Sequence, residues 1–411
     1  MSKKKKSGNN KKALSTWENW LCTIMTTPDK AKKGLFVLLI GLLFLPLIQA
    51  NLKLINIRPL DGSFVTGSDT ALTVADWFND SYQSKKTSYF NDNFGFRNFL
   101  VRLRNQLDYS FFNKANADDI VIGKKNYLFW LRQIKAYYGQ DFIGADSIEQ
   151  RMEMLKYVQD TLAKLHKTIV MVLAPGKAIF YPEYIPDKYR TAIGHTNYEY
   201  YRNYADKLGI NCIDLTAYLL GQRKSSKDSL FPQYGVHLSV DGNVYAGYVV
   251  MTIIGALRHI NLTKLIWKYG ENVDEEDKDL DAEKSMNLLF DLKKNKTLNV
   301  RPIVKDDKKP VVFPTVLIIG DSYARLMFTK SGLALAVSNM SHLWLYGKNF
   351  YAYGDIISLK KSYSFGKKYA KRMVLGHDVT VIMATDVNYP DFGFGIIEEL
   401  YKQFKSKQNV D

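Results

Sequence analysis

Apolar residues along this chain fall into short, nearly continuous runs that alternate with longer segments of helical periodicity. The runs are typical of strands buried on both faces of a sheet. They lie at residues 167–175, 210–215, 341–350, 378–387 and at the start of 314–328. Helical spacing predicts helices at 146–165, 196–207 and 240–260, the first with an apolar face of Ile148, Met152, Leu155, Val158 and Leu162. This alternation predicts an α/β fold with a largely parallel sheet flanked by helices.

A different pattern occupies residues 34–50, GLFVLLIGLLFLPLIQA, which carry no charge. Seventeen residues are at the short end for a membrane span, which takes about 20, but Lys33 and Lys53 can snorkel to the interfaces. We therefore expect one transmembrane anchor at 34–53. A cleaved signal peptide is the alternative, which the long preceding region and the poor cleavage site IQA disfavour.

Charge on the two sides of the apolar run predicts its orientation. Residues 1–33 hold nine lysines against Glu18 and Asp29, while Lys53 and Arg58 are the nearby basic residues after the run. The positive-inside rule makes 1–33 a basic cytoplasmic tail and places the main domain outside the cytoplasm. Within the tail, 14–25 is either a short interfacial helix or a frayed segment.

The rest of the chain divides into a lead-in and one large domain. Residues 54–118 mix turn residues with aromatics and predict a linker followed by one or two helices. Residues 119–130 predict a strand, a glycine turn and a second strand, and they open an α/β domain that we place at 119–411. An acidic run at 271–284, ENVDEEDKDLDAEK, predicts a solvated loop within an insertion near 271–310.

Composition excludes several classes of function. The formal net charge is +16, but it is concentrated in the tail, and no basic stripe or zinc-knuckle spacing indicates nucleic acid. The two cysteines, Cys22 and Cys212, flank the apolar run, so we expect no disulfide between them. No metal or nucleotide motif is visible, and we expect no cofactor.

The strongest local signal for chemistry is Gly320-Asp321-Ser322, directly after the run VLIIG. A parallel strand that ends in Gly-x-Ser and leads into a helix presents the serine at the carboxyl edge of the sheet, where α/β folds place their sites. Backbone N–H groups at the helix N-terminus can stabilise an oxyanion there. The alternative is that Asp321 or Ser322 only caps the helix.

A serine nucleophile needs a base, usually a histidine. Among six histidines, His237 in FPQYGVHLSVDGNVYAG lies in a turn between a polar loop and a core helix, where a base can be presented. His166, His195 and His259 have the surroundings of surface residues, and His377 precedes a strand. His342 is either packed or functional.

Five segments in order resemble the SGNH-hydrolase-like alginate O-acetyltransferase family. They are YFNDNFGFRNFLVRLRNQL (89–107), VIGKKNYLFW (121–130), APGKAIFYPEYIP (174–186), GVHLSVDGNVYAG (235–247) and IIGDSYARL (318–326). The resemblance covers roughly residues 76–390 and implies an SGNH-like fold, Ser322 as nucleophile and His237 as general base. It also implies a membrane-bound O-acyltransferase as acyl donor and a polysaccharide as acceptor.

The chain departs from the family pattern beside the histidine. The family's triad carboxylate falls two residues before it, where this chain has Gly235, and the tryptophan after it is replaced by Leu238. Three alternatives follow: a working Ser–His dyad, an imidazole oriented instead by Asp241, Asp228 or a backbone carbonyl, or a weakened catalyst.

Several other residues are candidates for the substrate cleft. We assign Asp321, Tyr323, Arg325 and Lys177 to substrate binding, although Arg325 can equally face solvent and Lys177 can cap a strand end. Asp214 is better explained as a helix cap than as a partner of His237.

The sequence thus supports three functions. The first is transfer of an acyl (acetyl) group through a serine ester onto hydroxyls of a cell-surface or exported polysaccharide. The second is a carbohydrate acetylesterase that uses the same pair with water. The third is a non-catalytic or weakened glycan-binding or assembly subunit.

Overall fold

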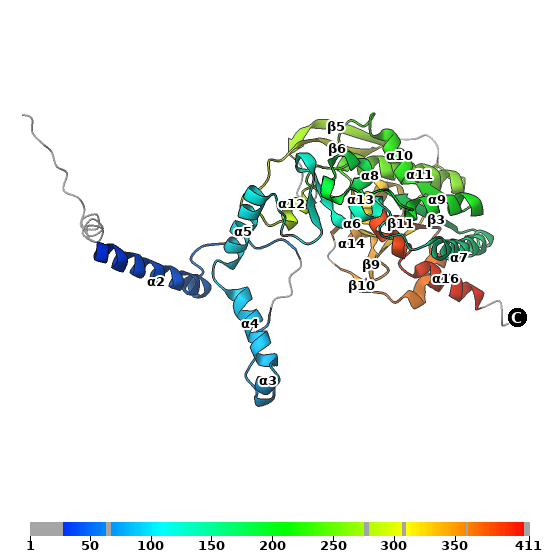
Figure 1. The fold of residues 1–411 in the computed structure, drawn as a ribbon. Coiled ribbons are helices and arrows are strands. Elements are labelled where there is room, and N and C mark those ends of the chain that lie inside the picture. The colour runs from blue at the N-terminus through cyan, green and yellow to red at the C-terminus, as the bar shows by residue number, and fades with distance from the viewer. Residues whose placement is uncertain (1–27, 63–66, 275–278, 306–309, 359–360, 407–411) are drawn as a thin grey trace, which may run out of the picture. The chain divides into compact units, whose positions relative to one another are not determined.

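The computed structural model describes residues 28–62, 67–274, 279–305, 310–358 and 361–406 (Figure 1). The chain divides into two compact units, Met1–Arg104 and Asn105–Asp411. The segment 14–25 and Cys22 lie outside the described residues, so the choice there between an interfacial helix and a frayed segment stays open.

The first unit is helical. It contains α2 (Pro28–Leu52), α3 (Val74–Phe78), α4 (Ser81–Asn93) and the start of α5 (Arg97–Phe112). The apolar side chains of α2 are largely exposed, and by length and composition the helix can cross a membrane. A second helix, α11 (Val240–Arg258), passes the same test but is half buried, so it is the core helix that the sequence predicted.

A seven-stranded sheet organises the second unit, in the order β10-β9-β8-β7-β11-β3-β4. From β8 to β4 the neighbours are parallel, and the two pairs at the other edge are antiparallel. The largely parallel sheet is therefore confirmed. Its strands are β3 (Thr168–Ala174), β4 (Cys212–Asp214), β7 (Val316–Gly320), β8 (His342–Leu345), β9 (Asn349–Ala352), β10 (Tyr363–Ser364) and β11 (Val379–Thr385). The run at 341–350, expected as one strand, is a hairpin of β8 and β9.

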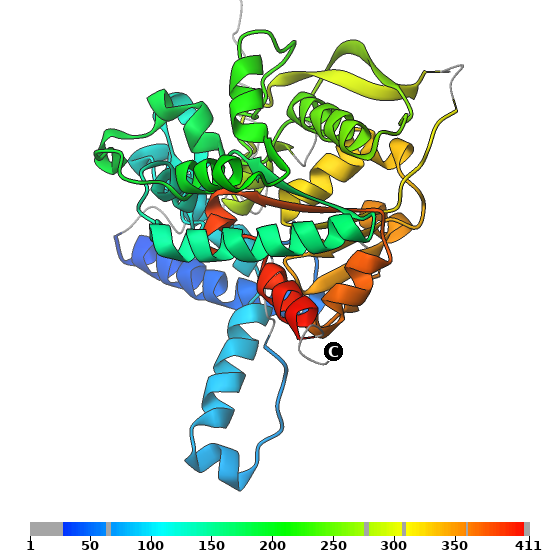
Figure 2. The same cartoon turned by 90° about the vertical axis from the view of Figure 1, so that its right-hand side faces the viewer.

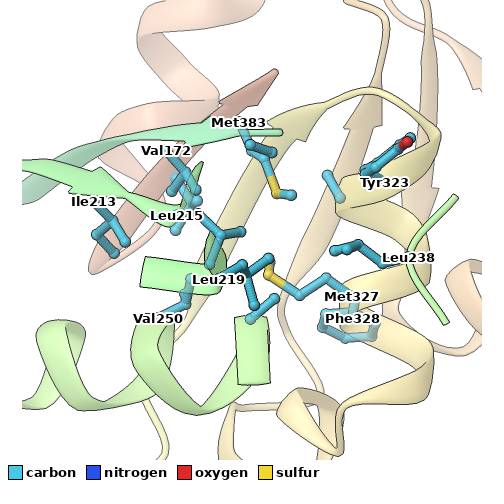
Figure 3. Close-up of a cluster of buried hydrophobic side chains, with 14 of the residues drawn as sticks. Val172, Ile213, Leu215, Leu219, Leu238, Val250, Tyr323, Met327, Phe328 and Met383 are labelled. Atoms are coloured by element: carbon cyan, nitrogen blue, oxygen red, sulfur yellow. The ribbon is translucent and has the colours of Figure 1, made fainter. Parts of the chain in front are cut away.

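Helices cover both faces of this sheet, because its strands are apolar on both sides. One face packs α10 (Leu215–Gln222), α11 and α13 (Ser322–Lys330), and Figure 3 shows part of that cluster. The other face packs α7 (Ala145–Lys164), α9 (Asn197–Leu208), α15 (Ala370–Leu375) and α16 (Ile396–Lys405), with α7 and α16 side by side (Figure 2). The five residues predicted as the buried face of α7 are the ones that the structure buries.

The acidic insertion is partly folded rather than a solvated loop. Strands β5 (Leu265–Asp274) and β6 (Lys296–Val304) form an antiparallel hairpin, and α12 (Asp281–Ser285) lies between them in sequence. Asp279, Leu280 and Ala282 are buried, since the apolar side chains of this segment pack in a third cluster with Ile120, Leu128 and Val236. The expectation of a solvated run is therefore wrong for the part around α12.

The remaining described elements are shorter. They are β1 (Ile120–Ile122), β2 (Leu128–Trp130), α6 (Leu131–Tyr137), α8 (Lys177–Phe180), α14 (Tyr353–Ser358) and 3-10 helices at Lys124–Asn126, Pro182–Tyr184, Asp187–Tyr189, Leu333–Ala336, Lys367–Tyr369 and Asp386–Asp391.

Candidate functional site

Ser322 lies where the sequence placed it, at the first residue of α13 and two residues after β7. Gly320 is required at the strand end, because a Cβ there would lie 2.5 Å from the Cβ of Ala324 and 2.9 Å from the carbonyl oxygen of Met383. This close packing turns the chain sharply from strand to helix. The Ser322 hydroxyl is left partly exposed at the carboxyl edge of the sheet.

Three side chains form a hydrogen-bonded line at this edge. The Nε2 atom of His237 lies 2.7 Å from the Oγ of Ser322, and its Nδ1 lies 2.5 Å from the Oδ2 of Asp281. A carboxylate at Nδ1 holds the proton on that nitrogen and leaves Nε2 free to accept the serine proton. The structure therefore brings Ser322 and His237 together and supplies a third group that the sequence did not identify.

Asp281 is held as an anion beside the imidazole. Burial acts to raise its pKa, but His237 and the N–H groups of Val236 and Ala282 outweigh burial, so the pKa is lowered. Both N–H groups donate to Oδ1 at 3.0 Å, which leaves Oδ2 for the histidine. The carboxylate is thus charged at neutral pH and fixed in direction.

The glycine at the expected carboxylate position explains why the orienting group comes from elsewhere. A Cβ on Gly235 would lie 2.4 Å from the carbonyl oxygen of Asp279. The backbone that leads into Asp281 therefore occupies the space beside residue 235. The Asp279 side chain, in turn, pairs with Lys330 at the end of α13 at 2.9 Å, and both side chains are nearly inaccessible. This ion pair fastens the segment that carries Asp281 to the helix that carries Ser322.

Neither carboxylate that we expected as a substitute contacts His237. Asp241 accepts a hydrogen bond from the hydroxyl of Tyr269 at 2.7 Å, and its burial raises its pKa. Asp228 accepts hydrogen bonds from Thr297 Oγ1 and from the Leu298 N–H. These partners lie on β5 and β6, so the two aspartates hold the inserted hairpin rather than orient the imidazole. The alternative of a backbone carbonyl is excluded by Asp281 at Nδ1.

Lys177 supports the histidine loop and does not face a substrate. Its side chain is fully buried, and its Nζ donates to the carbonyl oxygens of Gln233 and Gly235, both at 2.7 Å. The assignment of Lys177 to substrate binding is therefore replaced by a structural one. Tyr323 acts in the same place: it is buried, its hydroxyl donates to the Val236 carbonyl, and its ring lies 4.8 Å from that of His237.

Asp321 also belongs to the scaffold. Its Oδ1 accepts from the Tyr323 N–H, which caps α13, and its Oδ2 accepts from the N–H and hydroxyl of Thr385 and the amide of Asn388. The side chain is 1% exposed. The cap that the sequence offered as an alternative is therefore what the structure contains, and it ties the turn before Ser322 to the end of β11. Asp214 caps α10 through the Ala217 N–H, as expected.

Three further side chains that are not fully buried are neighbours of Ser322 or His237, either along the chain or through a direct contact. Arg325 follows Ser322 by one helical turn, and its partial burial lowers its pKa. The Ser322 N–H points to the hydroxyl of Tyr346 at 3.3 Å. Trp130 meets His237 edge to face at 5.5 Å between ring centroids. An aromatic ring thus lies against the histidine, although residue 238 is leucine.

The other histidines do not extend this arrangement. His342 and His377 bond to each other at 2.8 Å, and burial lowers the pKa of both. His342 begins β8, at the end of the sheet opposite Ser322. In the described part of the chain, no three His, Cys, Asp or Glu side chains are grouped to hold a metal ion.

Comparison with known proteins supports the family that the motifs predicted. Residues 120–297 match the family described as "SGNH hydrolase-like domain, acetyltransferase AlgX". A "Probable alginate O-acetylase AlgJ" of Pseudomonas syringae pv. tomato is 23% identical over 165 residues, 40% of each chain. Its counterpart in Azotobacter vinelandii is 26% identical over 172 residues, 41% of this chain and 42% of the relative. The matched segment spans about two fifths of these relatives.

Solved structures were found at low identity. The O-acetyltransferase domain of Pseudomonas putida AlgJ aligns with a TM-score of 0.45 and 18% identity, covering 69% of this chain and 99% of that one. Pseudomonas aeruginosa AlgX aligns with a TM-score of 0.44 and 10% identity, covering 68% and 67%.

Proposed function

We propose that this chain, which carries an SGNH-hydrolase-like domain of the alginate O-acetyltransferase family, moves an acetyl group through an ester on Ser322 to a hydroxyl of an exported polysaccharide. One observation carries the proposal: the continuous line Ser322–His237–Asp281, with 2.7 Å and 2.5 Å at its two hydrogen bonds. A weakened catalyst is the main alternative, because residue 235 is glycine and not the expected carboxylate. The Asp281 carboxylate beside Nδ1 of His237 argues against that alternative.

The line of groups supports a two-step transfer in which each proton has a place to go. Nε2 of His237 takes the hydroxyl proton as the Ser322 Oγ attacks the donor's carbonyl carbon, and the imidazolium returns that proton to the leaving group. A sugar hydroxyl then attacks the serine ester while giving its proton to Nε2. The serine oxygen leaves and recovers a proton from the same nitrogen. Asp281 stabilises the imidazolium in both steps.

An oxyanion site is available at the start of α13. The Ser322 N–H lies at the helix N-terminus, where the backbone carries partial positive charge. The Tyr346 hydroxyl, which now accepts from this N–H, has a proton of its own to donate. We assign these two groups to the carbonyl oxygen of the ester as it becomes negatively charged.

The apolar helix α2 supports a proposal for where the chain is located and where its acyl groups come from. We propose that α2 is an uncleaved anchor with its lysine-rich N-terminus in the cytoplasm and the SGNH-like domain outside the inner membrane. A membrane-bound O-acyltransferase would then supply the acetyl group at the same surface. The acceptor would be a polysaccharide on its way out of the cell.

The test is whether Ser322 becomes acetylated and passes the group on. Full-length protein in detergent is mixed with p-nitrophenyl acetate and analysed by intact mass, with Ser322→Ala beside it. Ser364→Ala, a change on the exposed strand β10, is the matched control. We expect an acetyl adduct in the wild type and the control, and none in Ser322→Ala.

Acceptor oligosaccharides then distinguish the functions. If acetylated sugar forms, the protein is a transferase. If the adduct is lost to free acetate and no acetylated sugar forms, the protein is an esterase. No adduct in the wild type, together with normal glycan acetylation in cells that carry Ser322→Ala, would refute both enzymatic functions.

A further inference from the structure

Helices α3 and α4 of the first unit bury none of their side chains. Helices of 5 and 13 residues are marginal in water on their own and normally depend on a covered apolar face. Large apolar side chains are nevertheless exposed on them and on the corner that follows. They include Val74 at 77%, Trp77 at 49%, Phe78 at 82%, Phe90 at 62% and Phe94 at 49%.

The corner between α4 and α5 is packed against the end of α2. A Cβ on Gly95 would lie 1.9 Å from the carbonyl oxygen of Pro46 and 2.8 Å from the backbone nitrogen of Ala50. Only glycine permits this approach. Asp92 and Arg97, on either side of the glycine, form an ion pair at 3.5 Å. The segment NDNFGFR (91–97), which contributes no residue to the candidate site, therefore packs closely against the apolar helix.

The contact with α2 fixes the depth of the corner relative to a bilayer. Pro46 lies six residues before the helix end at Leu52, about 9 Å along an axis that rises 1.5 Å per residue. If Gly34–Leu52 fills the hydrocarbon, the corner meets the helix about 9 Å inside the outer edge of the hydrocarbon, which is within the roughly 5–10 Å depth that an interfacial helix reaches. In both cartoon views α4 leaves this corner across the line of α2 rather than along it (Figures 1 and 2).

We propose that α3, α4 and the Phe94–Arg97 corner form an interfacial element that lies in the outer surface of the lipid bilayer beside the anchor. Phe90 lies in the last turn of α4 and Phe94 is the residue that follows the helix, while Trp77 and Phe78 insert at its far end. This inference rests on the proposed anchor. Residues 73–98 carry three acidic and three basic side chains, so neutral lipid is sufficient and binding depends little on salt.

The experiment places a fluorescent probe at single cysteines in the full-length protein. Cys22 and Cys212 are first replaced by alanine, and cysteines are introduced at Phe78, Phe90, Lys85 or Leu39. Each variant is labelled with an environment-sensitive dye and reconstituted into phosphatidylcholine vesicles with or without brominated acyl chains. Lys85 is the matched control on α4, since five residues at 3.6 per turn place it about 140° around the helix from Phe90. Leu39, in the middle of α2, reports the anchor itself.

We expect quenching and a blue shift at positions 39, 78 and 90, and an emission at 85 that stays that of a dye in water. If only the dye at position 39 is quenched, and the dyes at positions 78 and 90 behave like the dye at position 85, the interfacial element is refuted while the anchor stands. That result would also favour a protein partner as the cover of these side chains. No quenching at 39 refutes the anchor and the inference with it.

Discussion

Replacement of Asp281 by asparagine tests whether this carboxylate orients His237 in the proposed reaction. The amide keeps an oxygen for the N–H groups of Val236 and Ala282, so the α12 segment stays in place. Its NH2 group, however, replaces the Oδ2 that now lies 2.5 Å from Nδ1 of His237. An amide donor at Nδ1 selects the tautomer with the proton on Nε2, which cannot accept the serine proton.

The expected loss is large because the tautomer is wrong in nearly every molecule. Loss of the carboxylate in serine triads costs about 10⁴-fold in kcat, so we expect about 10³–10⁴-fold, or about 4–5.5 kcal/mol in activation free energy. The assay is the rate of acetyl-enzyme formation by stopped-flow release of p-nitrophenol. Thermal unfolding should change little, since the buried hydrogen bonds to Oδ1 remain.

Asp274→Asn is the matched control for this change. It makes the same substitution in the same acidic run, but Asp274 pairs with Lys296 on the surface, where both side chains are about 60% exposed. We expect its acetylation rate to stay at the wild-type value. A loss of less than tenfold in Asp281→Asn, or an equal loss in both variants, would refute Asp281 as the orienting group.

Three further substitutions test how the site is assembled. Gly235→Ala should cost about 1–3 kcal/mol of stability by overpacking against Asp279 and should slow acetylation, as measured by urea unfolding and the same kinetic assay. Unchanged values would contradict the close approach. Lys330→Met removes the ion pair of the buried Asp279 carboxylate, which should cost about 3 kcal/mol of stability. Acetylation should also be slower, and the loss of rate in the double variant with Asp281→Asn should be smaller than the sum of the two single losses in activation free energy. Full additivity would argue against coupling through this ion pair. Burial raises the pKa of Asp386 to about 8, so the folded state holds a proton that the unfolded state loses above about pH 4. Stability should therefore fall as pH rises from about 4 to 8, and Asp386→Asn should flatten that fall in urea titrations. An equally steep fall in the variant would contradict the assignment to Asp386.

Local pattern predicted much of the fold because each element carries its own signal. The face of α7 repeats at helical spacing, and the runs of β3, β7 and β11 are mostly apolar, with threonine as their polar residue, so burial could be assigned without knowing the partners. The hairpin of β8 and β9 was missed because both strands are apolar and the turn between them is short. A continuous apolar run does not state where it reverses.

Pairwise contacts were harder to predict where a charged side chain had several plausible partners. We predicted Lys177 as a cation that contacts the substrate, yet the fold buries it against two backbone carbonyls. We predicted Asp321, next to Ser322, as a residue of the cleft, yet four donors from its own helix and the end of β11 surround it. In both cases the side chain satisfies buried backbone or loop groups, which sequence spacing does not report.

By itself, the sequence determined the α/β class, the apolar helix and the place of Ser322 at the end of a buried strand. These follow from periodicity and short motifs, in which the relevant residues are neighbours in the chain. The pairing of Ser322 with His237 was predicted from the resemblance of five ordered segments to a known family. Only the tertiary structure decided which carboxylate completes the line. Residues 271–284 hold eight acidic side chains of similar local pattern, and Asp281 is separated from His237 by 44 positions. The choice depends on how Leu280 and Ala282 pack, on the space left by Gly235, and on the ion pair between Asp279 and Lys330. All three are contacts between segments that meet only when the chain has folded.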